Sequence, residues 1–183
     1  MSEPSDLANY KKLVLPGVGA YPNTMKRINK SGVAQAIVEF AQSGKPVLGI
    51  CLGMQILFES SYEFEETPGL GIEIGKIVPI QTKSRKVEFD VKPRIGWCQI
   101  EENPADGSNS STLLKGIKLP EDFYFVHSFK VSTPRLENVV AITRYVSDYY
   151  CAVYENKNIF GTQFHPEKSG QAGLKLLKNF SEL

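Results

Sequence analysis

The feature that most constrains this chain is a cysteine set between two glycines at the end of an apolar run. Residues 46–50 are mostly apolar and β-branched, and Gly49 and Gly53 lie two residues before and after Cys51. This Gly-x-Cys-x-Gly spacing is typical of a nucleophile elbow, a sharp turn from a strand into a helix. The turn residue is strained, and side chains two residues to either side would clash, so glycine is needed there.

An elbow of this kind also predicts the chemistry of its thiol. The sulfur lies at the N-terminus of a helix, where the helix dipole and free N–H groups lower the pKa of a thiol. A buried cysteine at the end of a strand is, however, often an inert packing residue. The elbow alone therefore leaves a catalytic and a packing interpretation of Cys51 open.

A cysteine nucleophile needs a base, and the chain offers only two histidines, His127 and His165. His165 follows a strand-like run, residues 158–164, and Pro166 ends that run. Glu167 lies two residues beyond His165, so both side chains can project the same way from an extended segment. A carboxylate there can orient the imidazole, as the third member of a catalytic triad does.

The surroundings of His127 differ. It lies in the aromatic run 123–129, with no carboxylate close behind it. A histidine in such a run is more often packed or bonded to the backbone than catalytic. The sequence therefore favours His165 over His127 as the base.

The order of these motifs resembles that of the class I (triad-type) glutamine amidotransferases, and within that class the HisH family, the glutaminase subunits of imidazole glycerol phosphate synthase. The matching segments are residues 15–21, 49–55, 69–71, 95–97, 124–129, 163–169, 172–173 and 177–180. So many motifs in one order make the resemblance specific over nearly the whole chain. It implies an α/β fold with a mixed, mostly parallel central sheet flanked by helices, and one domain spanning residues 1–183.

The resemblance also implies a role for each residue of the matching motifs. Cys51 is implied as the nucleophile, His165 as the base and Glu167 as the third triad member. The implied oxyanion hole is formed by backbone at Val18, Gly19 and Leu52. The residues implied in glutamine binding are Gly17, Gly53, Gln55, His127, Ser128 and Phe129. From the residues alone, Gln55 can equally be a solvated helix position.

The resemblance further implies glutamine hydrolysis through a cysteine thioester. The ammonia then passes to a (β/α)8-barrel cyclase subunit of the HisF type, held as a heterodimer, which makes imidazole glycerol phosphate and AICAR in histidine biosynthesis. Lys168 lies where the family meets that partner, although an ordinary surface lysine fits the sequence as well. No cofactor is implied.

Composition narrows the remaining classes of function. A net charge of +1 gives no electrostatic case for nucleic-acid binding. No apolar run approaches the ~18 residues of a membrane-spanning helix. Three scattered cysteines without a C-x-x-C pair suit a reducing cytoplasm, and with only two histidines they argue against a metal site.

Two departures from the family pattern stand out. The chain begins late relative to that pattern, without its first strand and helix, so a sheet edge would be uncovered unless something else covers it. Arg94 and Cys98 stand where the family usually has histidine and asparagine. Two alternatives therefore stay open: a HisH-like paralogue that supplies ammonia to another synthase, for example in surface-sugar amidination, and an inactive truncated scaffold subunit.

The hydrophobic pattern predicts the remaining elements. Strands are expected at residues 12–15, 72–80, 87–91, 122–127, 139–145, 151–155 and 158–163. Helices are expected at residues 23–29, 33–43, 52–60 and 171–180. Residues 103–111 are polar and are expected to form a solvated loop.

Overall fold

The computed structural model describes residues 4–80, 93–105, 111–145 and 148–183. Its elbow strand, β2 (Val47–Cys51), is buried along its whole length. Successive side chains of β2 enter opposite cores, since Val47 belongs to one hydrophobic cluster and Leu48 to the other. β2 lies parallel between β1 (Leu13–Gly17) and β11 (Ile159–Thr162). Burial on both faces explains why the sequence of β2 is a continuous apolar run rather than an alternating one.

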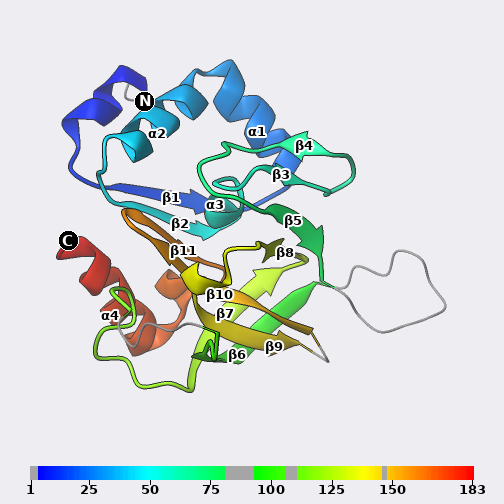
Figure 1. The fold of residues 1–183 in the computed structure, drawn as a ribbon, viewed down its shortest axis with the longest axis vertical. Coiled ribbons are helices and arrows are strands. Elements are labelled where there is room, and N and C mark those ends of the chain that lie inside the picture. Colours follow the sequence, from blue (N-terminus) through cyan, green and yellow to red (C-terminus); the bar gives the residue numbers. More distant parts are fainter. Residues whose placement is uncertain (1–3, 81–92, 106–110, 146–147) are drawn as a thin grey trace.

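The main sheet has seven strands in the order β1-β2-β11-β10-β9-β6-β7 (Figure 1). The strands not yet given are β6 (Arg94–Glu102), β7 (Glu121–His127), β9 (Val139–Tyr145) and β10 (Asp148–Asn156). Within the described part of this seven-stranded sheet, only the two pairs that involve β2 are parallel, and the other four are antiparallel. The prediction of a mixed sheet is confirmed. The sheet has fewer parallel than antiparallel strand pairs, however, whereas a mostly parallel sheet was expected. Short connections such as the one from β10 to β11 join antiparallel neighbours, whereas parallel strands need long crossovers.

Helices cover both faces of this sheet (Figure 1). α1 (Tyr21–Lys30) and α2 (Val33–Gln42) bury Tyr21, Met25, Ile37 and Phe40 in the core on one face. α4 (Gly170–Ser181) buries Leu176 and Phe180 in the core on the other. The shorter helical elements are η1 (Pro4–Asn9), α3 (Leu52–Gln55), η2 (Leu136–Asn138) and η3 (Pro166–Lys168). None of the described helices is long and apolar enough to cross a membrane.

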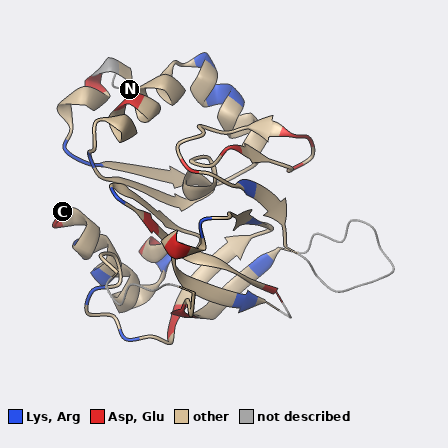
Figure 2. Ribbon diagram, in the orientation of Figure 1, with Lys and Arg blue, Asp and Glu red and all other residues tan. Residues whose placement is uncertain are grey.

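A second sheet, in the order β4-β3-β5-β8, lies beside the first. Its strands are β3 (Ser60–Ser61), β4 (Thr67–Pro68), β5 (Lys76–Pro79) and β8 (Phe129–Ser132). Only Ser128 separates β7 of the first sheet from β8 of the second, so the chain changes sheets there. Figure 2 shows acidic residues at the turn between β3 and β4, which carries Glu63, Glu65 and Glu66.

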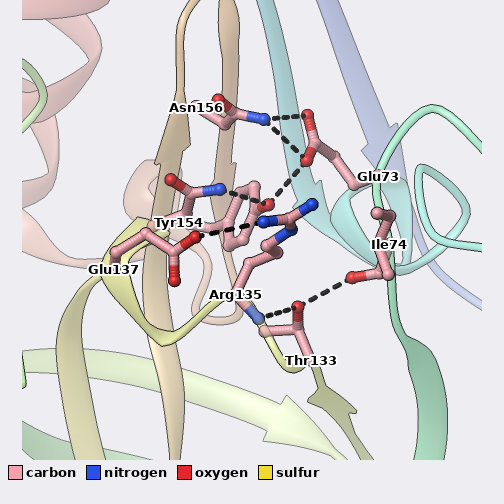
Figure 3. A network of polar contacts seen from close by, with 8 residues as sticks. Glu73, Ile74, Thr133, Arg135, Glu137, Tyr154 and Asn156 are labelled. Atoms are coloured by element: carbon pink, nitrogen blue, oxygen red, sulfur yellow. Dashed lines mark hydrogen bonds and ion pairs between the residues drawn. The ribbon is translucent and has the colours of Figure 1, made fainter.

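A buried carboxylate ties the loop before β5 to the main sheet (Figure 3). Glu73 accepts a hydrogen bond of 2.6 Å from the Tyr154 hydroxyl and two more from the Asn156 amide. Beside it, the Thr133 hydroxyl donates to the carbonyl oxygen of Ile74 at 2.7 Å. Because a buried carboxylate needs several donors, this network fixes the second sheet against β10.

Most predicted elements are confirmed within a few residues, but the elbow helix is shorter than predicted and some strands were not predicted. The elbow helix ends at Gln55 rather than at residue 60, because the next backbone groups bond to the loop before β5, as Ile72 N–H does to Leu57. β3, β4, β6 and β8 were not predicted. In β6 the usual pattern is inverted, with Arg94 buried and Ile95 and Trp97 exposed. The strand expected at residues 87–91 lies outside the described residues, and so do residues 106–110 of the expected solvated loop. At the start of that loop, Asn103 is buried rather than solvated.

Candidate active site

The elbow has the backbone that its glycine spacing predicts. Cys51 adopts φ 54° and ψ −111°, a conformation that residues other than glycine rarely take. A Cβ on Gly49 would lie 2.5 Å from Cα of Met54, and a Cβ on Gly53 would lie 1.7 Å from the carbonyl oxygen of Leu15. No side chain fits at either position. The strain at Cys51 is therefore held by close backbone packing on both sides of the turn.

His165 is buried and has one nitrogen bonded and one without a partner. Its Nδ1 lies 2.7 Å from Oε1 of Glu167, whose side chain is 47% exposed. Because a carboxylate only accepts, Nδ1 carries the proton and Nε2 is the basic nitrogen. Nε2 has no hydrogen-bond partner among the described residues. The sequence placed this pair on an extended segment, but a turn of η3 brings the two side chains together.

Backbone contacts hold the histidine in this orientation. The N–H of His165 donates to the carbonyl oxygen of Tyr124 in β7 at 2.9 Å. The Ser169 hydroxyl donates to the carbonyl oxygen of His165 at 2.6 Å and accepts from the N–H of Tyr124 at 2.9 Å. The predicted base, His165, is thus anchored to the sheet rather than to a free loop.

A cavity of about 260 Å³ opens beside the elbow. It brings together Cys51 and His165, which are far apart in the sequence. The residues around them in its wall are Val18, Gly19, Leu52, Gln55, Glu63, Pro93, Val126, His127, Ser128 and Phe129. Nine of the twelve predicted site residues therefore line it together: the nucleophile and base, the three oxyanion positions and four of the six glutamine-binding positions. Glu167 reaches it through His165.

Burial raises the pKa of the Cys51 thiol to about 11, even though the N–H of Leu52 and the amide of Gln163 point at the sulfur and lower it. The carboxylate of Glu167 raises it further. The sequence predicted a lowered pKa, and for the resting protein that prediction is wrong. α3 has only four residues, so its dipole is small, and the cost of a buried thiolate outweighs it.

Comparisons with known proteins agree with this geometry. A family model described as glutamine amidotransferase class-I matches residues 2–182. The imidazole glycerol phosphate synthase subunit HisH of Wolinella succinogenes is 46% identical over 181 residues, which cover 99% of this chain and 85% of that protein. The subunit HisH of Caldanaerobacter subterraneus subsp. tengcongensis is 41% identical over 182 residues, covering 100% and 84%. The chain belongs to the HisH family of class-I glutamine amidotransferases.

Solved structures confirm the fold of this amidotransferase. PurLQS from Thermotoga maritima matches with a TM-score of 0.67 at 23% identity, over 94% of this chain and 79% of that one. The glutaminase domain of Trypanosoma brucei CTPS, solved with bound acivicin, matches with a TM-score of 0.63 at 16% identity, over 98% and 74%. At these identities the likeness concerns the fold alone.

Two predicted glutamine-binding residues of the amidotransferase do not line the cavity. A Cβ on Gly17 would lie 2.6 Å from the backbone nitrogen of Gly53. The two glycines therefore let the end of β1 pack directly on α3, and this contact carries the neighbouring Val18 and Gly19 to the cavity wall.

His127 is buried in the amidotransferase with both nitrogens bonded, to the carbonyl oxygen of Phe129 at 2.8 Å and to the hydroxyl of Tyr150 at 3.1 Å. Burial lowers its pKa to about 4. Gln55 is buried too, donating to the same carbonyl at 2.9 Å and to Oε1 of Gln163 at 3.0 Å. The alternative interpretation of Gln55 as a solvated position is therefore wrong.

Sequence reasoning missed two residues of this site. Gln163 lies completely buried, with its amide 3.7 Å from the Cys51 sulfur. Glu63 is the acidic residue in the cavity wall, and its carboxylate accepts a 2.8 Å hydrogen bond from the N–H of Tyr21, just beyond the oxyanion segment. A polar residue two positions before His165 in an apolar strand was a signal for Gln163, whereas nothing local distinguishes Glu63 from its acidic neighbours.

Proposed function

We propose that residues 1–183 form one glutaminase domain that hydrolyses glutamine to glutamate and ammonia, as a subunit of imidazole glycerol phosphate synthase in histidine biosynthesis. The observation that carries the proposal is the pairing of an elbow thiol with an unpartnered histidine nitrogen at one small cavity. Relatives at 37–46% identity that are named subunit HisH support it.

The cavity suits glutamine at both ends of that molecule. The amide end faces Cys51, with the N–H groups at Leu52 and at the Val18–Gly19 segment as donors for the developing oxyanion. The carboxylate of Glu63 is the natural partner for the α-ammonium group. The walls between them come from Gln55 and the Ser128–Phe129 backbone.

The first half of the reaction acylates the cysteine. As the sulfur attacks the amide carbon, its proton passes to Nε2 of His165, and the carboxylate of Glu167 stabilises the imidazolium. The imidazolium then protonates the nitrogen of the tetrahedral intermediate, the C–N bond breaks, and ammonia leaves. A γ-glutamyl thioester on Cys51 remains.

The second half returns the enzyme to its starting state. Neutral His165 accepts a proton from water as the water oxygen attacks the thioester. The C–S bond breaks, glutamate leaves, and the proton returns to the sulfur. Because the resting thiol is protonated, each cycle begins and ends with a protonated Cys51, and the proton that returns to the sulfur comes from the water.

An exposed apolar surface beside the cavity suits a partner subunit. Val18 is 81% exposed, Ile95 63% and Trp97 57%. Ile95 pairs in register with Val126, a residue of the cavity wall. Exposed aliphatic and aromatic side chains of this kind mark protein interfaces. We propose a (β/α)8-barrel cyclase of the HisF type as the partner, in a cytoplasmic heterodimer, where free thiols stay reduced.

The test is glutamate release from glutamine, with and without a HisF-type subunit and its acceptor ligand. We expect partner-stimulated release that Cys51→Ala abolishes. Absence of release from folded protein with that partner would refute the proposal. Release without formation of imidazole glycerol phosphate would instead favour a paralogue that serves another synthase.

A further inference from the structure

The main sheet contains a buried guanidinium that the proposed chemistry does not use. Arg94, the first residue of β6, is only 4% exposed. Its side chain stacks over the ring of Phe125 at 4.7 Å and lies near the rings of Tyr145 and Tyr150. Its Nε donates to the Cys98 sulfur at 3.0 Å, and a terminal nitrogen donates to the Tyr150 hydroxyl at 2.5 Å. Aromatic faces and these two acceptors thus hold a charge that costs free energy to bury.

Tyr150 connects this guanidinium to His127. The Tyr150 hydroxyl lies 3.1 Å from Nε2 of His127, and Nδ1 of the same ring lies 2.8 Å from the carbonyl oxygen of Phe129. Four groups from three strands and the start of a fourth therefore form one continuous chain of hydrogen bonds.

The groups at the two ends of this hydrogen-bond chain constrain where the protons within it lie. A guanidinium only donates and a backbone carbonyl only accepts. The Tyr150 oxygen accepts from Arg94, and beside a neutral His127 ring its own proton points at Nε2. Nε2 is then the acceptor, and Nδ1 carries the ring proton and donates it to Phe129. The Phe129 carbonyl excludes the opposite tautomer, and burial and the nearby Arg94 charge, which both lower the pKa of His127, disfavour a protonated ring.

The far end of the chain lies in the wall of the glutamine cavity. The same Phe129 oxygen accepts a second hydrogen bond, from the Gln55 amide at 2.9 Å. Gln55 in turn donates to Gln163, whose amide reaches the Cys51 sulfur. The position of the Phe129 carbonyl is thus set jointly by His127 and by residues that touch the nucleophile.

We infer that Arg94 and Tyr150 are positioning residues for glutamine binding: through His127 they fix the Ser128–Phe129 backbone where the substrate lies. The inference rests on the proposed glutaminase function and adds to it a determinant of substrate affinity remote from the triad. The lowered pKa of His127, caused first by burial and also by the nearby Arg94 and His165, keeps the ring neutral near pH 7, as the chain of donors requires.

The first test reads the proton positions directly and does not depend on activity. The protein has only two histidines, so the ¹⁵N imidazole spectrum contains two spin systems and His127→Asn assigns them. We expect His127 at pH 7 with Nδ1 protonated and Nε2 acting as a hydrogen-bond acceptor. Tyr150→Phe moves the Nε2 resonance to that of an unbonded nitrogen, while the matched control Tyr149→Phe, at an exposed neighbour, leaves it in place. A proton on Nε2 of His127 in the wild type would overturn the inference.

The second test separates substrate binding from chemistry. Loss of one buried hydrogen bond at the cavity wall should raise KM for glutamine about fivefold to tenfold in Tyr150→Phe, with kcat within about threefold. Arg94→Met should act similarly, and Arg94→Lys, which keeps a donor, should restore most of the affinity. The chain of hydrogen bonds from Arg94 through Tyr150 and His127 to Phe129 is called the relay below. An unchanged KM in Tyr150→Phe, or a changed KM only in the Arg94 variants, would contradict the relay.

The outcomes of these two tests distinguish a failure of the relay from a failure of the proposed function. A wild type that releases no glutamate with its partner would refute the function, and the spectrum would still decide whether the relay exists. A fully active wild type with a mobile or Nε2-protonated His127 would refute the relay alone.

Discussion

The two histidines show how one side chain serves two purposes in the same cavity wall. Both are buried, and both hold a proton on Nδ1 against an oxygen acceptor, Glu167 for His165 and the carbonyl of Phe129 for His127. They differ at Nε2. In His127 that nitrogen accepts from Tyr150, whereas in His165 it has no partner among the described residues. In the proposed mechanism His165 acts as the base because its second nitrogen is left unpaired, not because of its burial or tautomer.

The charges around the two rings reinforce the difference. In the proposed mechanism the carboxylate beside His165 stabilises the imidazolium that forms during catalysis. Burial lowers the pKa of His127, and the nearby guanidinium of Arg94 lowers it further by destabilising the charged ring. In the proposed mechanism one histidine of the site therefore gains a proton during the reaction, whereas the other stays neutral.

The largest expected effect comes from replacing each histidine in turn. His165→Asn removes the base, so kcat for glutamine hydrolysis should fall by at least about 10³-fold. His127→Asn keeps an amide donor near Phe129, so it should act mainly on KM. Steady-state glutamate release from both variants measures the contrast. Equal losses of kcat would erase the proposed division of roles.

Neutralising the orienting group should have the next largest effect. Glu167→Gln can present either an acceptor or a donor to Nδ1 of His165, so the tautomer is no longer fixed and the imidazolium loses its counter-charge. We expect kcat to fall about 10²-fold with little change in KM, within the range for general acid–base catalysis. The same steady-state assay gives both constants. Wild-type kcat in this variant would show that burial alone orients the ring.

Acid should lower the free energy of unfolding, because the buried His127 stays neutral in the folded protein. Its pKa is about 4 in the folded protein against an ordinary value of 6.5, so between these values the unfolded chain binds more protons. The free energy of unfolding should therefore fall by about 2 kcal/mol from pH 7 to pH 5 on account of this residue. Urea denaturation at both pH values measures it. His127→Asn serves as the control, and an equal acid loss in that variant would assign the effect elsewhere.

The smallest effect is expected at the end of the relay farthest from the cavity. Cys98→Ser preserves an acceptor for the Nε of Arg94, so KM should stay within about twofold of the wild type. The glutamine saturation curve of this variant, set beside that of Arg94→Met, tests whether the guanidinium acts through Tyr150. A larger change in Cys98→Ser than in Tyr150→Phe would mean that the sulfur contact, not the relay, positions the arginine.

The sequence predicts those features of the site whose physical causes lie within a few residues of one another. The clashes that require Gly49 and Gly53 arise within a few residues of Cys51, and His165 and Glu167 are two residues apart, so these features are legible in the sequence. Glu63 reaches the cavity, and Gln163 reaches the Cys51 sulfur, only through the fold, and their roles were not found.

Non-local burial also explains the predictions that were wrong. The thiol pKa depends on how completely the fold buries Cys51, which outweighs the helix terminus beside it. β6 was missed because its arginine faces inward and its tryptophan outward, the reverse of the usual pattern, and the inward arginine makes sense only once Tyr150 and Phe125 are placed beside it.

A buried thiol that stays protonated at rest has a consequence for the lifetime of the enzyme. Peroxides and general alkylating reagents attack thiolates, and a thiol whose pKa is raised to about 11 presents almost none at neutral pH. The nucleophile is therefore chemically quiet between turnovers. In the proposed mechanism Cys51 becomes reactive only when a substrate fills the cavity and its proton moves to His165, so the raised pKa disfavours oxidation of this thiol while the enzyme is idle.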